Sequence, residues 1–246
     1  MTNQEPTSGE TDVPDGSAIA LKLGIELVKR ITPTGLAWIR AWFQGRKILV
    51  VGQPRAGKTS FVRYLQYGIF TDPDEKSPRT RKVRKSASFT VGMGKDQALK
   101  MQVRSTIDTV GQALASEHAA NTVLHHPDAL VIIVDLASDW RGQTEYQASH
   151  YLGEFCDHLA GELSEHKKLR KKLKAVVVVL NKKDLASNSK IISWRRGTER
   201  ILEEKLRASF GARVKDVPIL SCSLIERHDT GRSANAVIEA IALALS

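Results

Sequence analysis

The chain has 246 residues, of which 41% are hydrophobic and 26% charged, and its formal net charge at pH 7 is +10. This composition is that of a soluble globular protein, with length for one large domain or two small ones. The two cysteines, Cys156 and Cys222, lie far apart and lack metal-ligand spacing. They argue against a disulfide scaffold or a zinc site and favour a reducing compartment, so we expect a cytoplasmic protein, free or peripheral at a membrane.

The first 16 residues differ from the rest of the chain. MTNQEPTSGETDVPDG contains four acidic residues and no Lys or Arg, which predicts a disordered acidic leader over residues 1–16. The remaining chain holds 37 basic and 23 acidic residues. A body this basic attracts nucleic acid, anionic lipid or an acidic partner, and charge alone does not distinguish among them.

Residues 17–46 form an amphipathic segment. In SAIALKLGIELVKRI the polar residues recur at helical spacing and leave a broad apolar face, and LAWIRAWFQ then supplies aromatic side chains. The charges within the segment argue against a membrane span. Three interpretations stay open: a helix packed on the domain's own surface, an interfacial membrane helix, or a helix within residues 17–44 that docks on a partner.

From residue 47 onward, apolar runs alternate with helical patterns, which is typical of a mainly parallel α/β sheet. SASFTVGM (86–93) predicts an antiparallel edge strand, joined to the next strand as a hairpin through GKDQ. The other strands are expected at 47–51, 99–107, 129–136, 175–180 and 217–221. Helices are expected at 58–67, about 113–122, 143–162, 193–208 and 233–245, with Ser233 as the N-cap of the last. We place one domain over residues 47–246.

GQPRAGKTS, at residues 52–60, has the pattern of a phosphate cradle. Gly52, Gly57, Lys58 and Thr59 match G-x-x-x-x-G-K-[ST] between a predicted strand and a predicted helix. Small residues let the backbone curl, so that consecutive N–H groups point inward at a β-phosphate. The Lys58 ammonium would neutralise β- and γ-phosphate charge, and the Thr59 hydroxyl would ligate Mg²⁺. The positive end of the helix dipole adds to the same site.

DTVGQ, at the end of the strand expected at 99–107, carries groups suited to phosphate cleavage. The Asp108 carboxylate can hold Mg²⁺ through water, and the Gly111 N–H can sense a γ-phosphate. The Gln112 side chain can orient an attacking water. Read singly, Asp108 also fits a residue of an ordinary turn at a strand end.

NKKD (181–184) follows the most apolar strand and suits recognition of guanine. Asp184 can accept paired hydrogen bonds from the N1–H and the exocyclic amine, a pattern that adenine lacks. Lys182 can lie across the base, and Asn181 can tie this loop to the phosphate loop. In SCS (221–223), after another strand, the Cys222 N–H can reach the guanine carbonyl. Taken alone, NKKD also fits an ordinary solvated turn, and SCS alone is a weak signal.

The ordered set GQPRAGKT, DTVGQ, NKKD and SCS, each after a predicted strand, resembles the Ras-like small GTPase superfamily over residues 47–246. The resemblance implies a P-loop NTPase fold of three α/β/α layers, built on a mainly parallel six-stranded sheet with one antiparallel edge strand. It implies GTP or GDP as ligand and Mg²⁺ as cofactor. The amphipathic segment before the first strand is similar to the Arf branch. The residues assigned to the nucleotide are Gly52, Arg55, Ala56, Gly57, Lys58, Thr59, Ser60, Gly111, Asn181, Lys182, Asp184, Ser221, Cys222 and Ser223.

Small GTPases also carry a Thr on a mobile loop that closes on Mg²⁺ and the γ-phosphate. TDPDEKSPRTRKVRK offers Thr71 and Thr80, and we choose Thr80 because it lies between the Pro78 turn and the edge strand; an ordinary loop threonine is the alternative. The resemblance thus implies Thr59, Thr80 and Asp108 as Mg²⁺ ligands. It implies Gln112, Lys58 and Thr80 as the catalytic residues.

The centre of the phosphate loop departs from the family pattern. Pro54 removes a backbone N–H and fixes φ near −65°. The donors that matter are expected from Arg55 through Ser60, so phosphate binding survives. Pro54 nevertheless stands near the expected positions of the γ-phosphate and Gln112, where its bulk can disturb hydrolysis. The Arg55 side chain is expected to point to solvent or to pair with an acidic neighbour.

Together these motifs predict a molecular switch that binds GTP·Mg²⁺ and hydrolyses it slowly without an activating partner. Switch segments at 71–92 and 109–127 would contact an effector or activating protein. The alternative is a nucleotide-locked scaffold or adaptor with little turnover, which Pro54 favours. The basic clusters RTRKVRK (79–85) and KKLRKKLK (167–174) lack interleaved aromatic residues, so no specific nucleic acid is expected, and a ribosome- or RNA-associated GTPase is the weaker third hypothesis.

Overall fold

The computed structural model describes residues 46–67, 84–85, 89–93, 99–103, 105–108, 114–137, 147–210, 216–224 and 232–245. All of them belong to one compact unit, Ile39–Ser246. The acidic leader expected at 1–16 lies outside the described residues, as does the amphipathic segment 17–46 except for its last residue, Arg46.

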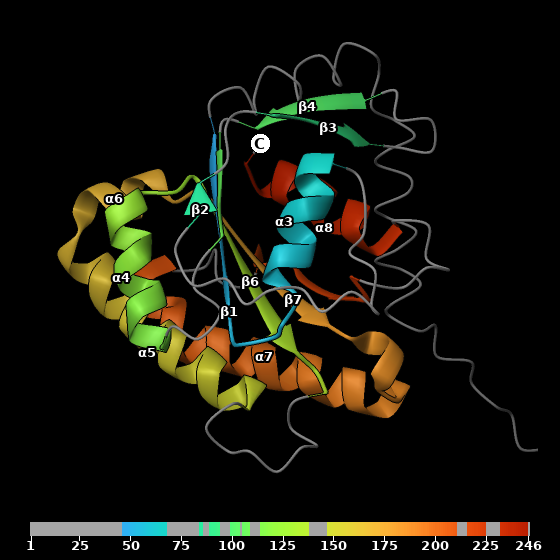
Figure 1. Ribbon diagram of the computed structural model, residues 1–246. Coiled ribbons are helices and arrows are strands. Elements are labelled where there is room, and N and C mark those ends of the chain that lie inside the picture. Colours follow the sequence, from blue (N-terminus) through green and yellow to red (C-terminus); the bar gives the residue numbers. More distant parts are fainter. Residues whose placement is uncertain are drawn as a thin grey trace, which may run out of the picture. The chain divides into compact units, whose positions relative to one another are not determined.

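Six of the described strands form the central sheet, in the spatial order β2-β5-β1-β6-β7-β8 (Figure 1). The strands from β5 to β8 in this order run parallel to their neighbours, and β2 pairs with β5 in the antiparallel sense. A mainly parallel α/β sheet is therefore confirmed. The bounds of these strands are β1 Lys47–Gly52, β2 Arg84–Lys85, β5 Ser105–Asp108, β6 Ala129–Asp135, β7 Ala175–Asn181 and β8 Ile219–Cys222.

The predicted composition of the sheet was wrong at its edge. The strand expected at 86–93 is β3 (Phe89–Met93), and it pairs with β4 (Leu99–Val103) in a separate two-stranded sheet. The hairpin itself is confirmed, but the antiparallel strand of the central sheet is the short β2. The strand expected at 99–107 is divided between β4 and β5. Alternation of apolar and polar residues predicts a strand. It does not predict which strand it pairs with, because pairing depends on tertiary packing.

Helices pack on both faces of the sheet, so the unit has three layers. Apolar side chains of α3 (Lys58–Tyr67) and α8 (Arg232–Leu245) share one core cluster with Val131 and Ile133 of β6. Those of α4 (Ala115–His125), α5 (Ala148–Glu165) and α7 (Asn188–Phe210) share the other with Leu130 and Ile132. Because both faces of β6 and β7 are covered, every residue of these two strands is buried, which explains their unbroken apolar sequences.

All five predicted helices are confirmed. The helix expected at 58–67 has the bounds of α3, and the other four differ from the prediction at one or both ends. The helix expected at 143–162 begins at Ala148, because Gln147 has extended backbone and serves as its N-cap. The last helix begins at Arg232, so Ser233 lies inside its first turn and the predicted N-cap was wrong. The basic run before β7 contains a short helix, α6 (Lys167–Lys172), which the sequence reading treated only as a charge cluster. Leu169 and Leu173 of this run are buried and fix it to the core.

Candidate nucleotide-binding site

The loop from Gly52 to Gly57 joins β1 to α3, and both glycines have positive φ. At Gly52 (φ 155°) a Cβ atom would stand 2.0 Å from the carbonyl oxygen of Ile133. At Gly57 (φ 100°) it would stand 2.5 Å from Nδ2 of Asn181. Each glycine therefore allows a close approach that no side chain permits, first of β6 and then of the segment that ends β7.

Pro54 and Arg55 form the tip of this loop. The Ala56 N–H donates to the Gln53 carbonyl oxygen at 3.3 Å, and Arg55 has φ 61°. Proline at the second position of a turn and positive φ at the third are the signature of a type II turn. Arg55 is exposed, in agreement with a side chain that points to solvent. Pro54 thus pre-sets the turn that carries the backbone around to Ala56 and Gly57.

The Lys58 side chain folds back into the loop that precedes it. Its Nζ donates to the carbonyl oxygen of Gly52 at 2.7 Å and to that of Gln53 at 3.0 Å, and the residue is 5% exposed. A buried ammonium requires such partners, because desolvation without them is costly. The positive charge is held within the curl of backbone where the pattern predicts phosphate. Thr59 and Ser60 follow in the first turn of α3 and are half-buried.

Asn181 connects three segments that are distant in sequence. Its Nδ2 donates to the Ala56 carbonyl oxygen at 2.8 Å, and its Oδ1 accepts the Leu224 N–H at 3.0 Å. The side chain is buried, so both of its polar ends are satisfied within the protein. It makes the contact with the phosphate loop that the sequence suggested. Because Leu224 follows SCS, it also joins the two expected base-binding segments to that loop.

Lys182 and Asp135 form an ion pair at the carboxyl ends of β7 and β6. Lys182 has φ 66°, and its Nζ donates to Oδ2 of Asp135, while Oδ1 of Asp135 accepts the Ala137 N–H at 2.8 Å. The Asp135 side chain is 5% exposed. Asp184 lies in the short 3₁₀ helix η3 (Lys183–Leu185) and is exposed. A carboxylate available to solvent at this edge is suited to accept hydrogen bonds from a base.

Asp135 is a site residue that the sequence reading missed. It stood inside the expected strand at 129–136 and received no role. The sequence does show an acidic residue near the end of an otherwise apolar run. In a parallel sheet, ligands bind beside the carboxyl ends of strands, where such a residue would lie. Its partner could not be recognised from sequence, because Lys182 lies 47 positions away.

The SCS segment closes the site on the side of β8. Ser221 and Cys222 are the last residues of the strand, and Cys222 pairs in register with Asn181. Cys222 and Ser223 are buried, and Oγ of Ser223 has no hydrogen-bond partner among the described residues. A buried hydroxyl without a partner is costly, so Ser223 is an unsatisfied polar group at the end of this segment.

Four predicted site residues are described only in part or not at all. Asp108 ends β5, and its backbone pairs in register with Val50, two residues before the loop. Thr80, Gly111 and Gln112 lie outside the described residues. The switch segment expected at 71–92 also lies outside the described residues, except for 84–85 and 89–92. Of the segment expected at 109–127, residues 109–113 lie outside them, whereas most of the remainder forms α4. Their roles in nucleotide binding and catalysis stay predictions.

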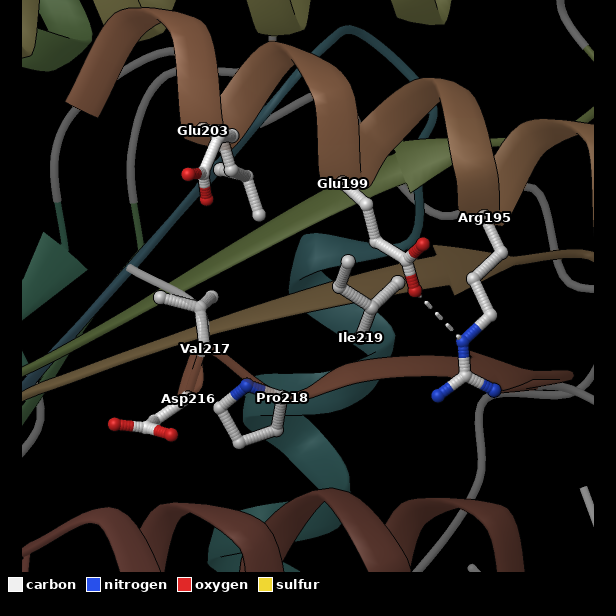
Figure 2. Close-up of a pocket in the computed structure, with 8 residues that line it drawn as sticks. Arg195, Glu199, Glu203, Asp216, Val217, Pro218 and Ile219 are labelled. Atoms are coloured by element: carbon white, nitrogen blue, oxygen red, sulfur yellow. Dashed lines mark ion pairs between the residues drawn. The ribbon is translucent and has the colours of Figure 1, made fainter. Parts of the chain in front are cut away.

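A pocket of about 410 Å³ lies elsewhere, between α7 and the segment that enters β8 (Figure 2). On α7, Arg195 and Glu199 form an ion pair along its edge, with Nε and Oε1 3.5 Å apart. Its strand residues are at the amino end of β8, whereas the loop, NKKD and SCS follow the carboxyl ends of strands. It contains no predicted site residue. The residues lining it are Arg195, Glu199, Leu202, Glu203, Asp216, Val217, Pro218 and Ile219.

Three further features of the described residues bear on other classes of site. No group of three or more His, Cys, Asp or Glu side chains among them is placed to hold a metal ion. Within the same ranges, no helix is long and apolar enough to cross a membrane. Both cysteines are buried free thiols.

A comparison with protein-family models finds no match, and a comparison with curated proteins finds none either. Among solved structures, the chain is similar to translation elongation factor SelB from Methanococcus maripaludis in complex with the GTP analogue GppNHp. The TM-score is 0.47 and the identity 16%, over 79% of this chain and 33% of that chain, so this chain spans about a third of the SelB length. This similarity is too low to carry an argument about function.

Proposed function

We propose that this protein is a P-loop GTPase of the Ras-like kind, which binds guanine nucleotide and hydrolyses GTP slowly to GDP and phosphate. The observation that supports it most is the position of Asn181. One buried amide joins the phosphate loop at Ala56 to the segment after SCS at Leu224, and it begins NKKD. These contacts support the proposal that a phosphate cradle and two segments suited to guanine form one site.

The base specificity is tested with Asp184→Asn. A carboxylate accepts from both the N1–H and the amine of guanine, whereas an amide presents one donor and one acceptor. We expect the variant to bind GDP about a hundredfold more weakly and to prefer xanthosine diphosphate, whose 2-oxo group accepts the new N–H. Asp157→Asn, at an exposed residue on α5, is the matched control. Equal binding of GDP by parent and Asp184→Asn would contradict the proposal.

Mg²⁺ is part of the same proposal. Thr59 lies in the first turn of α3 beside Lys58, and the Asp108 backbone is in register with β1, so two of the three proposed ligands come from adjacent segments. Thr80 is proposed as the third. When bound, the ion would neutralise charge between the β- and γ-phosphates. We expect chelation of Mg²⁺ to accelerate GDP release, measured with a fluorescent GDP.

For hydrolysis we propose Gln112 as the residue that orients water. Its replacement in Gln112→Leu should abolish single-turnover cleavage of bound GTP while GTP affinity stays unchanged. Unaided turnover is expected at roughly 10⁻⁴ to 10⁻² s⁻¹, as is typical when no arginine supplies charge to the transition state. Retention of full hydrolysis in Gln112→Leu would remove this role.

A second candidate, a nucleotide-locked scaffold, is favoured by the type II turn at Pro54. The turn fixes a bulky residue at the tip of the cradle, where it can obstruct water or an incoming arginine. This candidate predicts nucleotide that copurifies with the protein and equal partner affinity in Gln112→Leu and the parent. Pro54→Gly separates the two: a rise in hydrolysis without a change in GDP affinity assigns the obstruction to Pro54.

The partners belong to the same proposal. Segments 71–92 and 109–127 would contact an effector or activating protein, and residues 17–44, in an Arf-like manner, a membrane surface or a partner. We expect the protein to act in the cytoplasm or peripherally at a membrane, with no specific nucleic acid. Pulldown with liposomes or partner, comparing GDP with a non-hydrolysable GTP analogue, tests both contacts. Salt-dependent retention of RNA would instead favour an RNA-associated GTPase.

A further inference from the structure

The basic run before β7 is held on the surface of the domain by two buried leucines. KKLRKKLK (167–174) has six basic residues in eight positions. Leu169 and Leu173 are buried and belong to the core cluster to which α5 contributes. The Leu173 N–H donates to the Leu169 carbonyl oxygen at 2.8 Å, so the two side chains lie one helical turn apart on the inner face. The exposed positions of the run are all basic: Lys167, Lys168, Arg170, Lys171 and Lys174.

These cations lack the counter-charges found on a neighbouring helix. On α7, Arg195 pairs with Glu199 one turn away, with Nε and Oε1 3.5 Å apart. Within the part of the chain that the structure describes, no ion pair joins a basic residue of 167–174 to a carboxylate. Glu165, the exposed acidic residue just before the run, offsets one of the six charges at most. Like charges this close repel one another, so the run keeps a concentrated positive field.

Asp128 joins the end of this run to the start of β1. The Asp128 carbonyl oxygen accepts the Lys174 N–H at 2.9 Å, and the Asp128 N–H donates to the Lys47 carbonyl oxygen at 2.9 Å. The Asp128 side chain accepts the Lys47 N–H at 2.9 Å and pairs with Arg46 at 3.4 Å. Arg46 is the last residue of the amphipathic segment 17–46. That segment therefore ends at the same corner of the domain as the basic run.

This corner is remote from the candidate nucleotide site. The run leads into the amino end of β7, whereas the phosphate loop and NKKD follow the carboxyl ends of β1 and β7 (Figure 1). β7 has seven residues, and each advances the chain by about 3.3 Å, so roughly 20 Å separate the two edges of the sheet. A surface in contact with α6 would leave the nucleotide loop open to solvent.

We propose that the exposed face of KKLRKKLK is a docking surface for an anionic lipid bilayer, and that it acts together with segment 17–46. Anionic headgroups supply the counter-charges that this face lacks. The apolar and aromatic residues of segment 17–46 supply a second contact, and two such contacts together give stable attachment where one alone is weak. A single-stranded nucleic acid fits less well, because the run has no aromatic residue on which a base could stack. The inference goes beyond the proposed function and does not depend on nucleotide binding.

The test compares two double variants of the full chain, each of which loses two exposed cations one helical turn apart. Lys167→Gln with Lys171→Gln changes α6, and Arg196→Gln with Arg200→Gln changes α7. Co-sedimentation is measured with vesicles of phosphatidylcholine and phosphatidylserine. The affinity of the α6 variant should be about ten- to thirtyfold below that of the parent, the range for two charges at an anionic surface. The α7 variant should stay within about twofold, because salt screens charges that lie outside the contact.

Binding of the parent should weaken as salt is added and should be lost on vesicles of phosphatidylcholine alone. Both variants should keep the melting temperature and the GDP affinity of the parent, because the changed side chains are exposed and lie away from the phosphate loop. Equal vesicle affinity in the two variants would overturn the inference, as would tighter binding of the parent to polyuridylate RNA than to the anionic vesicles. A parent that binds these vesicles but no GDP would overturn the proposed function alone.

Discussion

Lys182 and Asp135 illustrate how single residues stabilise the candidate site at the carboxyl ends of β7 and β6. The ion pair is largely removed from solvent, with side chains 17% and 5% exposed. It holds the lysine that follows Asn181, in a left-handed backbone conformation that bulky residues rarely adopt. Asp135 also accepts the Ala137 N–H, so the carboxylate is fixed from both oxygens. Asp135 therefore fixes the Lys182 side chain at the carboxyl ends of β6 and β7.

Asp135→Asn should destabilise the protein and weaken GDP binding. The variant keeps an acceptor for Ala137 but leaves the partly buried Lys182 ammonium without its counter-charge. We expect the free energy of unfolding to fall by about 1–3 kcal/mol. Denaturation of the GDP complex measures it. In Asp157→Asn, the lost carboxylate pairs with Lys205 at an exposed position, so no measurable change is expected. Similar losses in both variants would argue against a role for burial.

Gly57→Ala should disrupt the contact between phosphate loop and NKKD. The new Cβ would lie 2.5 Å from Nδ2 of Asn181, at a backbone φ of 100°. The conformation alone costs about 1–3 kcal/mol, and the clash adds to it. Isothermal titration should show lower GDP affinity. Gly197→Ala on α7 is the matched control: the Cβ meets nothing within 4 Å there, and we expect stabilisation by about 0.5–1 kcal/mol. Unchanged GDP affinity in Gly57→Ala would contradict the close approach.

At the scale of single residues, the motif residues could be predicted from the sequence, but the distant residues that contact them could not. The spacing of Gly52, Gly57 and Lys58 is a local property, because one turn of backbone brings them together. The pairing of Asp135 with Lys182 depends on β6 lying beside β7, and the hydrogen bond between His118 and Tyr151 depends on how α4 packs on α5. Neither pairing can be recognised in the linear sequence.

Among the elements, the buried strands were the easiest to predict and the sheet edge the hardest. Helices cover both faces of β6 and β7, so these strands are apolar throughout. Such short, unbroken apolar runs are typical of buried strands in a parallel sheet. The edge strand was misplaced, because the short β2 has no apolar signature and the more regular β3 pairs elsewhere. Helix ends differed by several residues where the first turn carries few apolar side chains, as at Ala148.

The inner face of α5 predicts a specific pH dependence. Burial raises the pKa of the Cys156 thiol from 9.0 to about 12, with Asp157 adding to the rise. The unfolded chain loses the thiol proton first as pH rises, so the folded state loses stability above about pH 9. The slope is at most about 1.4 kcal/mol per pH unit.

Denaturation at pH 8, 9 and 10 measures this slope, and Cys156→Ala should reduce it over the same interval. The comparison stops at pH 10 because burial also raises the pKa values of Tyr64 and Tyr151, whose usual value is 10.0. In the folded protein the Cys156 thiol should not react with an alkylating reagent at pH 8. Rapid alkylation of the native protein would show that the inner face of α5 opens.

For the whole molecule, we predict that the nucleotide site is independent of residues 1–45. The described loop, its Asn181 link and both core clusters are formed by residues from Ile48 onward. A deletion of 1–45 should keep GDP dissociation within about twofold of the full chain. It should abolish vesicle or partner binding if the amphipathic segment provides that contact. Loss of GDP binding on deletion would show instead that the segment packs on the domain and supports the site.

The link from Asn181 to Ala56 has a further consequence, for the order of folding. The two residues are 125 positions apart, so their hydrogen bond closes a very long loop, and such contacts form late. Asn181 ends β7, and β7 must pair with β6, which in turn pairs with β1, before the amide reaches the loop. In a chain emerging from the ribosome, GQPRAGKTS is therefore complete long before Asn181 can contact it. We therefore expect nucleotide to bind last and to stabilise the assembled sheet.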